Sequence, residues 1–326
     1  MGVKKTVGKK VLITGGFGFL GGRIACEAAR QASWQVRLAS RRDFNSPSWL
    51  PEAEVAPFDL LKPETFDNAL KEVRAVVHLA AINEAESREF PERAVEVNTL
   101  GTLRLLNAAI RAGVERFIYF STAHVYGSPL AGHITECSLA RPIHPYAITH
   151  HAAEEFVLAA RDKGSIQGIV LRQSNGFGAP THMGADCWML LVNDLCRQAV
   201  RDKKMVLRSS GIQQRDFITL HDVARAASHF LDLPRDRCAD GLFNVGGGAS
   251  MSVLAMAQRV IKCCRETLGY EPALIRPQPG ADESAVDLNY DINKLKQTGF
   301  VLNGDRDEEI KQTLKICAAM HQGAKA

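Results

Sequence analysis

Short apolar runs alternate with segments of helical periodicity over the first 175 residues of the chain. Continuous apolar strands suit a sheet that is covered on both faces, and helices between them imply right-handed crossovers between parallel strands. The pattern therefore predicts an α/β fold with a doubly wound parallel sheet. The predicted strands are Lys10–Thr14, Trp34–Ser40, Glu54–Phe58, Ala75–Ala80, Arg116–Ser121 and Gln167–Arg172, and the predicted helices are Phe19–Ala32, Pro91–Ala112 and Tyr146–Arg161.

The alternation loosens after Asn175. Two stretches, Gly176–Gly184 and Arg276–Glu283, are rich in glycine and proline. Short strands there are mixed with four helical segments, namely Cys187–Asp202, His221–Leu231, Val253–Leu268 and Asp307–Met320. We therefore expect a main domain of residues 1–174 plus about 214–247, and a smaller C-terminal α/β substrate domain of residues 175–213 and 248–326.

Composition and charge narrow the function classes. The 326 residues are 46% hydrophobic and 23% charged, as in ordinary globular proteins, and the net charge of +4 is too small to indicate nucleic-acid binding. There is no apolar run of the ~20 residues that cross a membrane, and no apolar segment precedes Val11 as in a signal peptide. The eight cysteines form no CxxC pair and the ten histidines show no metal-ligand spacing. We expect a cytoplasmic protein with reduced thiols, no metal and no membrane partner.

A glycine turn follows the first strand and opens the first helix. Such a turn lets the backbone approach a pyrophosphate, and the helix start offers free N–H groups and the positive end of the dipole. The strand–turn–helix context is what distinguishes a dinucleotide-binding, Rossmann-type loop from a chance glycine pattern. The predicted contacts from this loop are Gly15, Gly18, Phe19, Leu20 and Gly21.

The end of the second strand predicts which dinucleotide is bound. A carboxylate there binds the ribose 2′-hydroxyl of NAD, whereas arginine accommodates the 2′-phosphate of NADP. The expected position is Ser40, followed by Arg41 and Arg42. These residues favour NADP(H), with NAD(H) as the alternative and Asp43 as its best ribose ligand.

An ordered series of motifs resembles the extended short-chain dehydrogenase/reductases, the NAD-dependent epimerase/dehydratase family. The resemblance begins at the glycine loop and covers nearly the whole chain. It implies that Asp59 and Leu60 contact the adenine, that Leu79, Ala80 and Ala81 lie under the cofactor phosphates, and that Asn98 is a structural helix asparagine. The further matching segments are Ser121–Gly127, Leu171–Asn175, Arg215–Ile218 and Phe243–Gly246.

The same resemblance implies a substrate and a partner. The family acts mostly on nucleotide-activated sugars and usually forms dimers through a four-helix interface, so we expect a nucleotide-sugar substrate and a homodimer. Asn175 is implied to face the substrate and Arg215 to hold the diphosphate, while His124 lies where sugar contacts are expected. The family often has an arginine before a Gly-Asp near the C-terminus, which Pro279–Asp282 lacks. Either Arg276 replaces this missing arginine, or Arg215 alone holds the diphosphate. A non-nucleotide ketone is the rival substrate class.

The resemblance also implies the catalytic residues, with one departure. Thr122 and Tyr146 match the hydroxyl pair that handles the substrate oxygen, but His150 stands where the family has a lysine. The i,i+4 spacing places His150 on the helical face of Tyr146. Lysine is a permanent cation, whereas an ordinary histidine is mostly neutral at pH 7 and becomes an imidazolium below about pH 6.5.

This substitution bears on the direction of hydride transfer. Oxidation needs the phenolate as a base, whereas ketone reduction needs only the phenol as an acid. We therefore expect an NAD(P)-dependent keto-sugar reductase. An epimerase or dehydratase is the alternative within the family, and a non-catalytic dinucleotide-binding protein is the alternative from another class.

Overall fold

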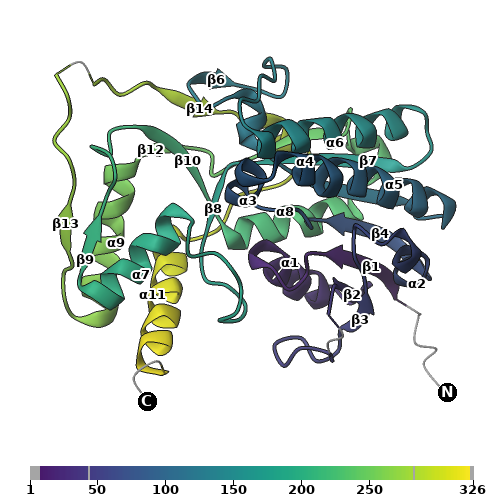
Figure 1. Cartoon of the computed structure of the whole chain (residues 1–326), viewed down its shortest axis with the longest axis horizontal. Coiled ribbons are helices and arrows are strands. Elements are labelled where there is room, and N and C mark those ends of the chain that lie inside the picture. The colour runs from purple at the N-terminus through teal and green to yellow at the C-terminus, as the bar shows by residue number, and fades with distance from the viewer. Residues whose placement is uncertain (1–7, 43–44, 282, 324–326) are drawn as a thin grey trace. The chain divides into compact units, whose positions relative to one another are not determined.

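The computed structural model describes residues 8–42, 45–281 and 283–323, so Asp43 and Asp282 lie outside the described residues. The chain divides into two compact units, which are shown in Figure 1. The first unit comprises Met1–Val125, Ala140–Arg172 and Ala224–Phe243, and the second comprises Tyr126–Leu139, Gln173–Val223 and Asn244–Ala326. The domain boundaries expected from the sequence differ in detail from these packed units and stay a prediction.

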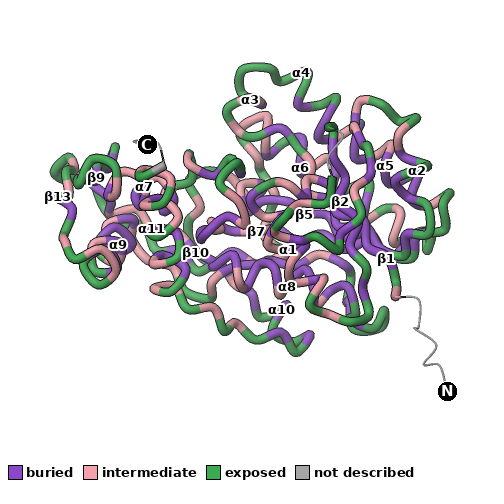
Figure 2. Tube along the Cα trace, turned by 90° about the horizontal axis from the view of Figure 1, so that it is seen from below, coloured by how far each residue is buried: buried purple, intermediate pink, exposed green. Residues whose placement is uncertain are grey.

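The first unit is built on a seven-stranded sheet with the order β11-β7-β5-β4-β1-β2-β3. The pairs of β1 with β2 and β4, of β2 with β3, and of β4 with β5 are all parallel. Such a sheet is covered on both faces, and its strands are almost continuously buried apart from the edge strand β3 (Figure 2). The strands are β1 (Lys9–Thr14), β2 (Trp34–Ser40), β3 (Glu54–Pro57), β4 (Val73–His78), β5 (Arg116–Thr122), β7 (Gln167–Gln173) and β11 (Leu242–Val245).

Helices flank this sheet, as the alternating pattern predicts, and the predicted Rossmann-type α/β fold is confirmed. Helices α4 and α5 follow one another along the chain, and both lie beside α6 (Figure 1). The helices are α1 (Phe19–Arg30), α2 (Phe66–Leu70), α3 (Glu84–Glu89), α4 (Pro91–Ala94), α5 (Thr102–Arg111), α6 (Pro145–Asp162) and α8 (Leu220–Asp232).

Two predicted elements need correction. The helix predicted over Pro91–Ala112 is interrupted by a π-helical segment, Val95–Gly101, which carries the buried Asn98. The strand predicted over Ala75–Ala80 ends at His78, and the next two backbone N–H groups donate to the hydroxyl of Thr14 in β1. Hydrophobic periodicity does not record side-chain hydrogen bonds such as those to Thr14.

The second unit contains small sheets and a helical core. Its three-stranded sheet has the order β12-β10-β8, and the pairs β13-β9 and β14-β6 are separate. The strands are β6 (Gly132–Ile134), β8 (Asn175–Phe177), β9 (Lys204–Val206), β10 (Gln214–Thr219), β12 (Ser250–Ser252), β13 (Ala273–Ile275) and β14 (Leu288–Tyr290). The helices are α7 (Leu191–Asp202), α9 (Val253–Leu268), α10 (Asn293–Gln297) and α11 (Arg306–Gly323).

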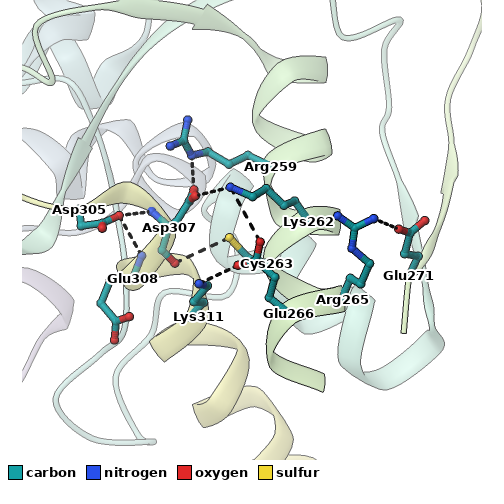
Figure 3. Close-up of polar contacts among 10 residues, drawn as sticks. All are labelled: Arg259, Lys262, Cys263, Arg265, Glu266, Glu271, Asp305, Asp307, Glu308 and Lys311. Carbon is teal, nitrogen blue, oxygen red and sulfur yellow. Dashed lines mark hydrogen bonds and ion pairs between the residues drawn. The ribbon is translucent and has the colours of Figure 1, made fainter. Parts of the chain in front are cut away.

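Apolar packing and ion pairs hold α7, α9 and α11 together. Phe177, Phe217 and Leu314 belong to the buried cluster that these helices share with β8 and β10. At the edge of this core, Asp307 of α11 lies between Arg259 and Lys262 of α9 (Figure 3). Within the described part of the chain, no helix is both long and apolar enough to cross a membrane.

Candidate active site

The glycine loop between β1 and α1 is shaped by two glycines. Gly15 has φ +67°, a left-handed conformation that favours glycine. A Cβ on Gly21 would lie 2.1 Å from the carbonyl oxygen of Gly15, so no larger residue fits there. Helix α1 begins after Gly18 without a side-chain cap and has no acidic residue in its first turn. This arrangement fits a dinucleotide pyrophosphate, whose charge the uncapped N–H groups and the helix dipole would stabilise.

A buried chain of hydrogen bonds supports this loop from behind. Leu79 N–H and Ala80 N–H donate to Thr14 Oγ1 at 3.1 and 3.2 Å, and the Thr14 hydroxyl lies 2.6 Å from His78 Nδ1. His78 Nε2 lies 2.9 Å from Thr102 Oγ1, which donates to the carbonyl of Asn98 at 2.6 Å. These partners require a neutral imidazole, and burial lowers the pKa of His78 to about 3. The chain fixes the segment predicted to lie under the cofactor phosphates.

The predicted adenosine contacts lie at the ends of β2 and β3. Ser40 is buried at the end of β2, and its hydroxyl accepts a hydrogen bond from Arg42 N–H at 3.2 Å. Arg41 and Arg42 are exposed. After β3, Asp59 Oδ1 accepts from Leu61 N–H at 3.0 Å, which closes a tight turn beside Leu60. The loop thus presents two guanidinium groups to solvent and turns the serine side chain back onto the backbone.

Tyr146 and His150 lie together on α6, with ring centroids 4.1 Å apart. His150 Nδ1 lies 2.8 Å from the carbonyl oxygen of Tyr146, so this nitrogen carries a hydrogen and donates to it. The His150 side chain is buried, and burial lowers its pKa to about 4. Burial also raises the pKa of Tyr146 to about 12, and the charge of Glu84 adds to this effect. A neutral imidazole therefore stands beside a protonated phenol at neutral pH.

One expectation about this pair is wrong. An ordinary histidine would become an imidazolium below about pH 6.5, but the burial of His150 moves that step to about pH 4. The loss of hydration disfavours the charged ring by more than the nearby Glu154 stabilises it. Mild acid therefore does not restore the positive charge that a lysine would supply.

Further polar side chains of the first unit lie around Tyr146. His144 stacks on the tyrosine ring at 6.2 Å with an interplanar angle of 20°, and His124 meets the His144 ring edge-on at 5.5 Å. The buried Thr122 ends β5, and its hydroxyl accepts from His124 N–H at 3.2 Å. The sequence singled out Thr122, His124, Tyr146 and His150, and all four lie in the first unit. Thr122 is on β5, His124 is in the turn that follows β5, and Tyr146 and His150 are on α6.

The two remaining predicted residues lie on paired strands of the second unit. Asn175 of β8 donates to the carbonyl of Asp216 at 2.9 Å, and β8 runs parallel to β10, which carries Arg215. Asp216 is buried, and its Oδ1 accepts from the Ser174 hydroxyl and from Gly247 N–H. Burial raises the pKa of this carboxyl group. The backbone around Arg215 is therefore fixed by buried hydrogen bonds.

Arg215 lines a cavity of about 290 Å³ in the second unit. The charged groups in its lining are Arg197, Arg208, Arg215 and Asp194, and Arg197 pairs with Asp194 at 2.7 Å. Three guanidinium groups and one carboxylate give this lining a net charge of +2. A larger cavity of about 740 Å³, between β10 and the start of α11, contains no predicted site residue in its described lining. We therefore base the site on the smaller, more cationic cavity.

Sequence reasoning missed several supporting residues. One of them is His144, whose place directly before a proline at a helix start marks a capping position. The links from Thr14 through His78 to Thr102 had no local signal, because they join residues 64 and 24 positions apart. Ser174 and Asp216 likewise pair across 42 positions.

The fold and the glycine loop define a dinucleotide-binding α/β protein. The sequence profile of the NAD dependent epimerase/dehydratase family matches residues 11–246. The chain belongs to this family, as the motifs indicated, and is thus an enzyme of the extended short-chain dehydrogenase type.

Similar proteins span nearly the whole chain. The dTDP-D-glucose 4,6-dehydratase of Mus musculus is 26% identical, over 94% of this chain and 88% of its own length. The UDP-glucose 4-epimerase of Azospirillum brasilense is 29% identical, over 91% and 88%. Among solved structures, the UDP-glucose 4-epimerase of Thermotoga maritima with UDP-glucose has a TM-score of 0.78 at 25% identity, over 95% and 99% of the two chains. These relatives are named as epimerases and dehydratases, so the comparisons support that alternative better than the keto-sugar reductase.

The substitution His150→Lys tests the role of the neutral imidazole. A permanent cation beside Tyr146 lowers the pKa of the phenol, so the rate of sugar oxidation at pH 7.5 should rise at least tenfold relative to the rate of reduction. Both rates are measured at saturating cofactor. His151→Lys is the matched control, because it places the same charge on the next residue of α6, where His151 contacts Glu154 instead. An equal change in both directions, or the same effect in the control, contradicts the account.

Proposed function

We propose that this enzyme transfers hydride between a nicotinamide dinucleotide, which the glycine loop binds, and a nucleotide-activated sugar, whose diphosphate Arg215 binds. The observation that carries this proposal is the cationic cavity around Arg215, in a chain of the NAD dependent epimerase/dehydratase family. The names of the relatives make an epimerase or a dehydratase the first candidate.

The charge and geometry of the cavity suit a nucleoside diphosphate. Its net charge of +2 balances the about two negative charges of a diphosphate ester, and guanidinium forks bind phosphate oxygens in pairs. Leu195, Leu207 and Val253 supply an apolar wall in the same lining, which suits the face of a base. Asn175 lies on the neighbouring strand, where we propose that it contacts the sugar.

The chemistry follows from the hydroxyl groups of the first unit. When bound, the nicotinamide supplies or accepts the hydride. We propose that Tyr146 exchanges the proton of the reacting sugar oxygen, that Thr122 hydrogen-bonds the same oxygen, and that His124 contacts the sugar. His150 positions Tyr146 through its ring contact and can hydrogen-bond a ribose through Nε2, since its Nδ1 is used by the backbone.

A keto-sugar reductase is the second candidate, and the Tyr146–His150 pair favours it. With a pKa of about 12, only about one Tyr146 in 10⁵ is a phenolate at pH 7. Reduction needs the phenol, which is abundant, whereas epimerisation and dehydration begin with an oxidation that needs the scarce phenolate. Products from a panel of UDP-, dTDP-, GDP- and CDP-sugars separate the candidates, because only net reduction consumes the reduced cofactor stoichiometrically.

We also propose a homodimer formed through the helices of the first unit. Apolar side chains are exposed along the π-helical segment and on α6. Val95 is 54% exposed, Ile148 47% and Phe156 40%, and clustered exposed apolar residues commonly mark interfaces. The expected four-helix interface would cover them. The cytoplasmic location stays an expectation.

The cofactor preference is tested by replacing Arg41 and Arg42 together with alanine. We propose that these arginines bind the 2′-phosphate of NADP, because Ser40 supplies no carboxylate and both guanidinium groups are exposed. The double variant should lose at least tenfold in NADPH affinity and change NADH affinity less than twofold. Arg30→Ala, at another exposed arginine of the same unit, should change neither. Equal binding of NADPH and NADH by the wild type at fixed salt would refute the preference.

The substrate class is tested by Arg215→Ala. Loss of a charge-assisted hydrogen bond should weaken nucleoside diphosphate binding by about 1.5–3 kcal/mol, or roughly 10- to 150-fold, while the dinucleotide affinity is unchanged. Calorimetric titration with UDP, dTDP, GDP and CDP measures this loss. Arg201→Ala, at an exposed arginine of α7 paired with Asp202, is the control. If none of the four nucleotides binds the wild type, the nucleotide-sugar proposal is wrong.

A further inference from the structure

His144 lies at the N-cap of α6, two residues before Tyr146. Its backbone is extended, with φ −136° and ψ 152°, and its side chain accepts a hydrogen bond from Ala147 N–H through Nδ1 at 3.3 Å. We propose that His144 is a positioning residue for Tyr146, which holds the first turn of α6 through this cap and thereby fixes the tyrosine for proton transfer. This proposal rests on the proposed function, because it assigns proton transfer to Tyr146.

The first turn of α6 depends strongly on this cap. The first N–H groups of a helix have no intrahelical acceptor, and helix ends fray when those groups are unsatisfied. Pro145 at the start of α6 has no N–H, and there is no acidic residue in the first turn. The Nδ1 of His144 therefore supplies the side-chain acceptor for a turn that contains Tyr146. Loss of this acceptor would loosen the backbone that carries the phenol.

The ring of His144 makes a second contact with the same residue. It stacks nearly parallel to Tyr146, at 6.2 Å and 20°, and is itself met edge-on by His124. Tyr146 is also in contact with His150, at 4.1 Å. The tyrosine ring thus touches two imidazoles of its own helix region, one before it and one after it in the sequence.

The hydrogen bonds assign opposite neutral tautomers to these two imidazoles. His144 Nδ1 accepts from a backbone N–H, so its proton is on Nε2, whereas His150 Nδ1 donates to a carbonyl.

Three substitutions separate the cap from the ring. His144→Ala removes both, His144→Asn keeps a good capping acceptor without the ring, and His144→Phe keeps a ring without the acceptor. We expect kcat to fall at least fivefold in the Ala and Phe variants with KM changed less than twofold, and to recover to within twofold of wild type in the Asn variant. Asp305→Ala, which removes the side-chain acceptor for the Asp307 and Glu308 N–H groups at the start of α11, is the matched control and should leave kcat unchanged.

Amide hydrogen exchange of the segment 144–150 gives a readout that needs no substrate. Exchange should be faster in the Ala and Phe variants and like wild type in the Asn variant. The proposal is overturned if Ala behaves as wild type, if Phe rescues and Asn does not, or if kcat and KM change together. If the wild type converts no nucleotide sugar, the proposed function is wrong, but the cap is still tested by amide exchange. Unchanged exchange in the Ala variant would refute the cap in that case too.

Discussion

Among the described residues, no lysine or arginine contributes to the pKa shift of Tyr146, and the proposed chemistry depends on this fact. Burial disfavours ionisation of both Tyr146 and His150, which raises the pKa of the phenol to about 12 and lowers the pKa of the imidazole to about 4. Desolvation is the largest cause of both shifts. The pair is therefore neutral at neutral pH, and the proposed function uses the phenol of Tyr146 as an acid.

The surrounding scaffold keeps the pair and the cofactor loop in place by neutral hydrogen bonds. His78, buried beneath the loop, joins Thr14 to Thr102 and, through Thr102, to the backbone of Asn98. Asn98 in turn donates to Thr149 of α6 at 3.1 Å and accepts from Ile82 N–H at 2.9 Å. One connected network thus reaches from the glycine turn to the helix that carries Tyr146. The π-helical segment is the local distortion that brings Asn98 into this network.

Sequence reasoning predicted the sheet, the glycine loop and the i,i+4 pair well, because each depends on local pattern. β2 and α9 were predicted at their observed bounds. The identity of the family followed from the order of its motifs. The split of the Pro91–Ala112 helix and the low pKa of His150 could not be read in this way. They arise from contacts between distant residues and from burial, which appear only when the chain is folded. The preference for reduction over epimerisation or dehydration was predicted from His150 alone, and the names of the relatives support the alternative better.

The ionisation of Tyr146 tests the central claim most directly. The chain has five tyrosines, so labelling them with ¹³C at Cζ gives a small set of signals, and Tyr146→Phe identifies the one that belongs to Tyr146. Titration of the folded wild type follows the chemical shift of that carbon with pH. The account predicts that the Tyr146 signal stays at the phenol position up to at least about pH 10, since burial raises its pKa. A transition to the phenolate near pH 7 would contradict it.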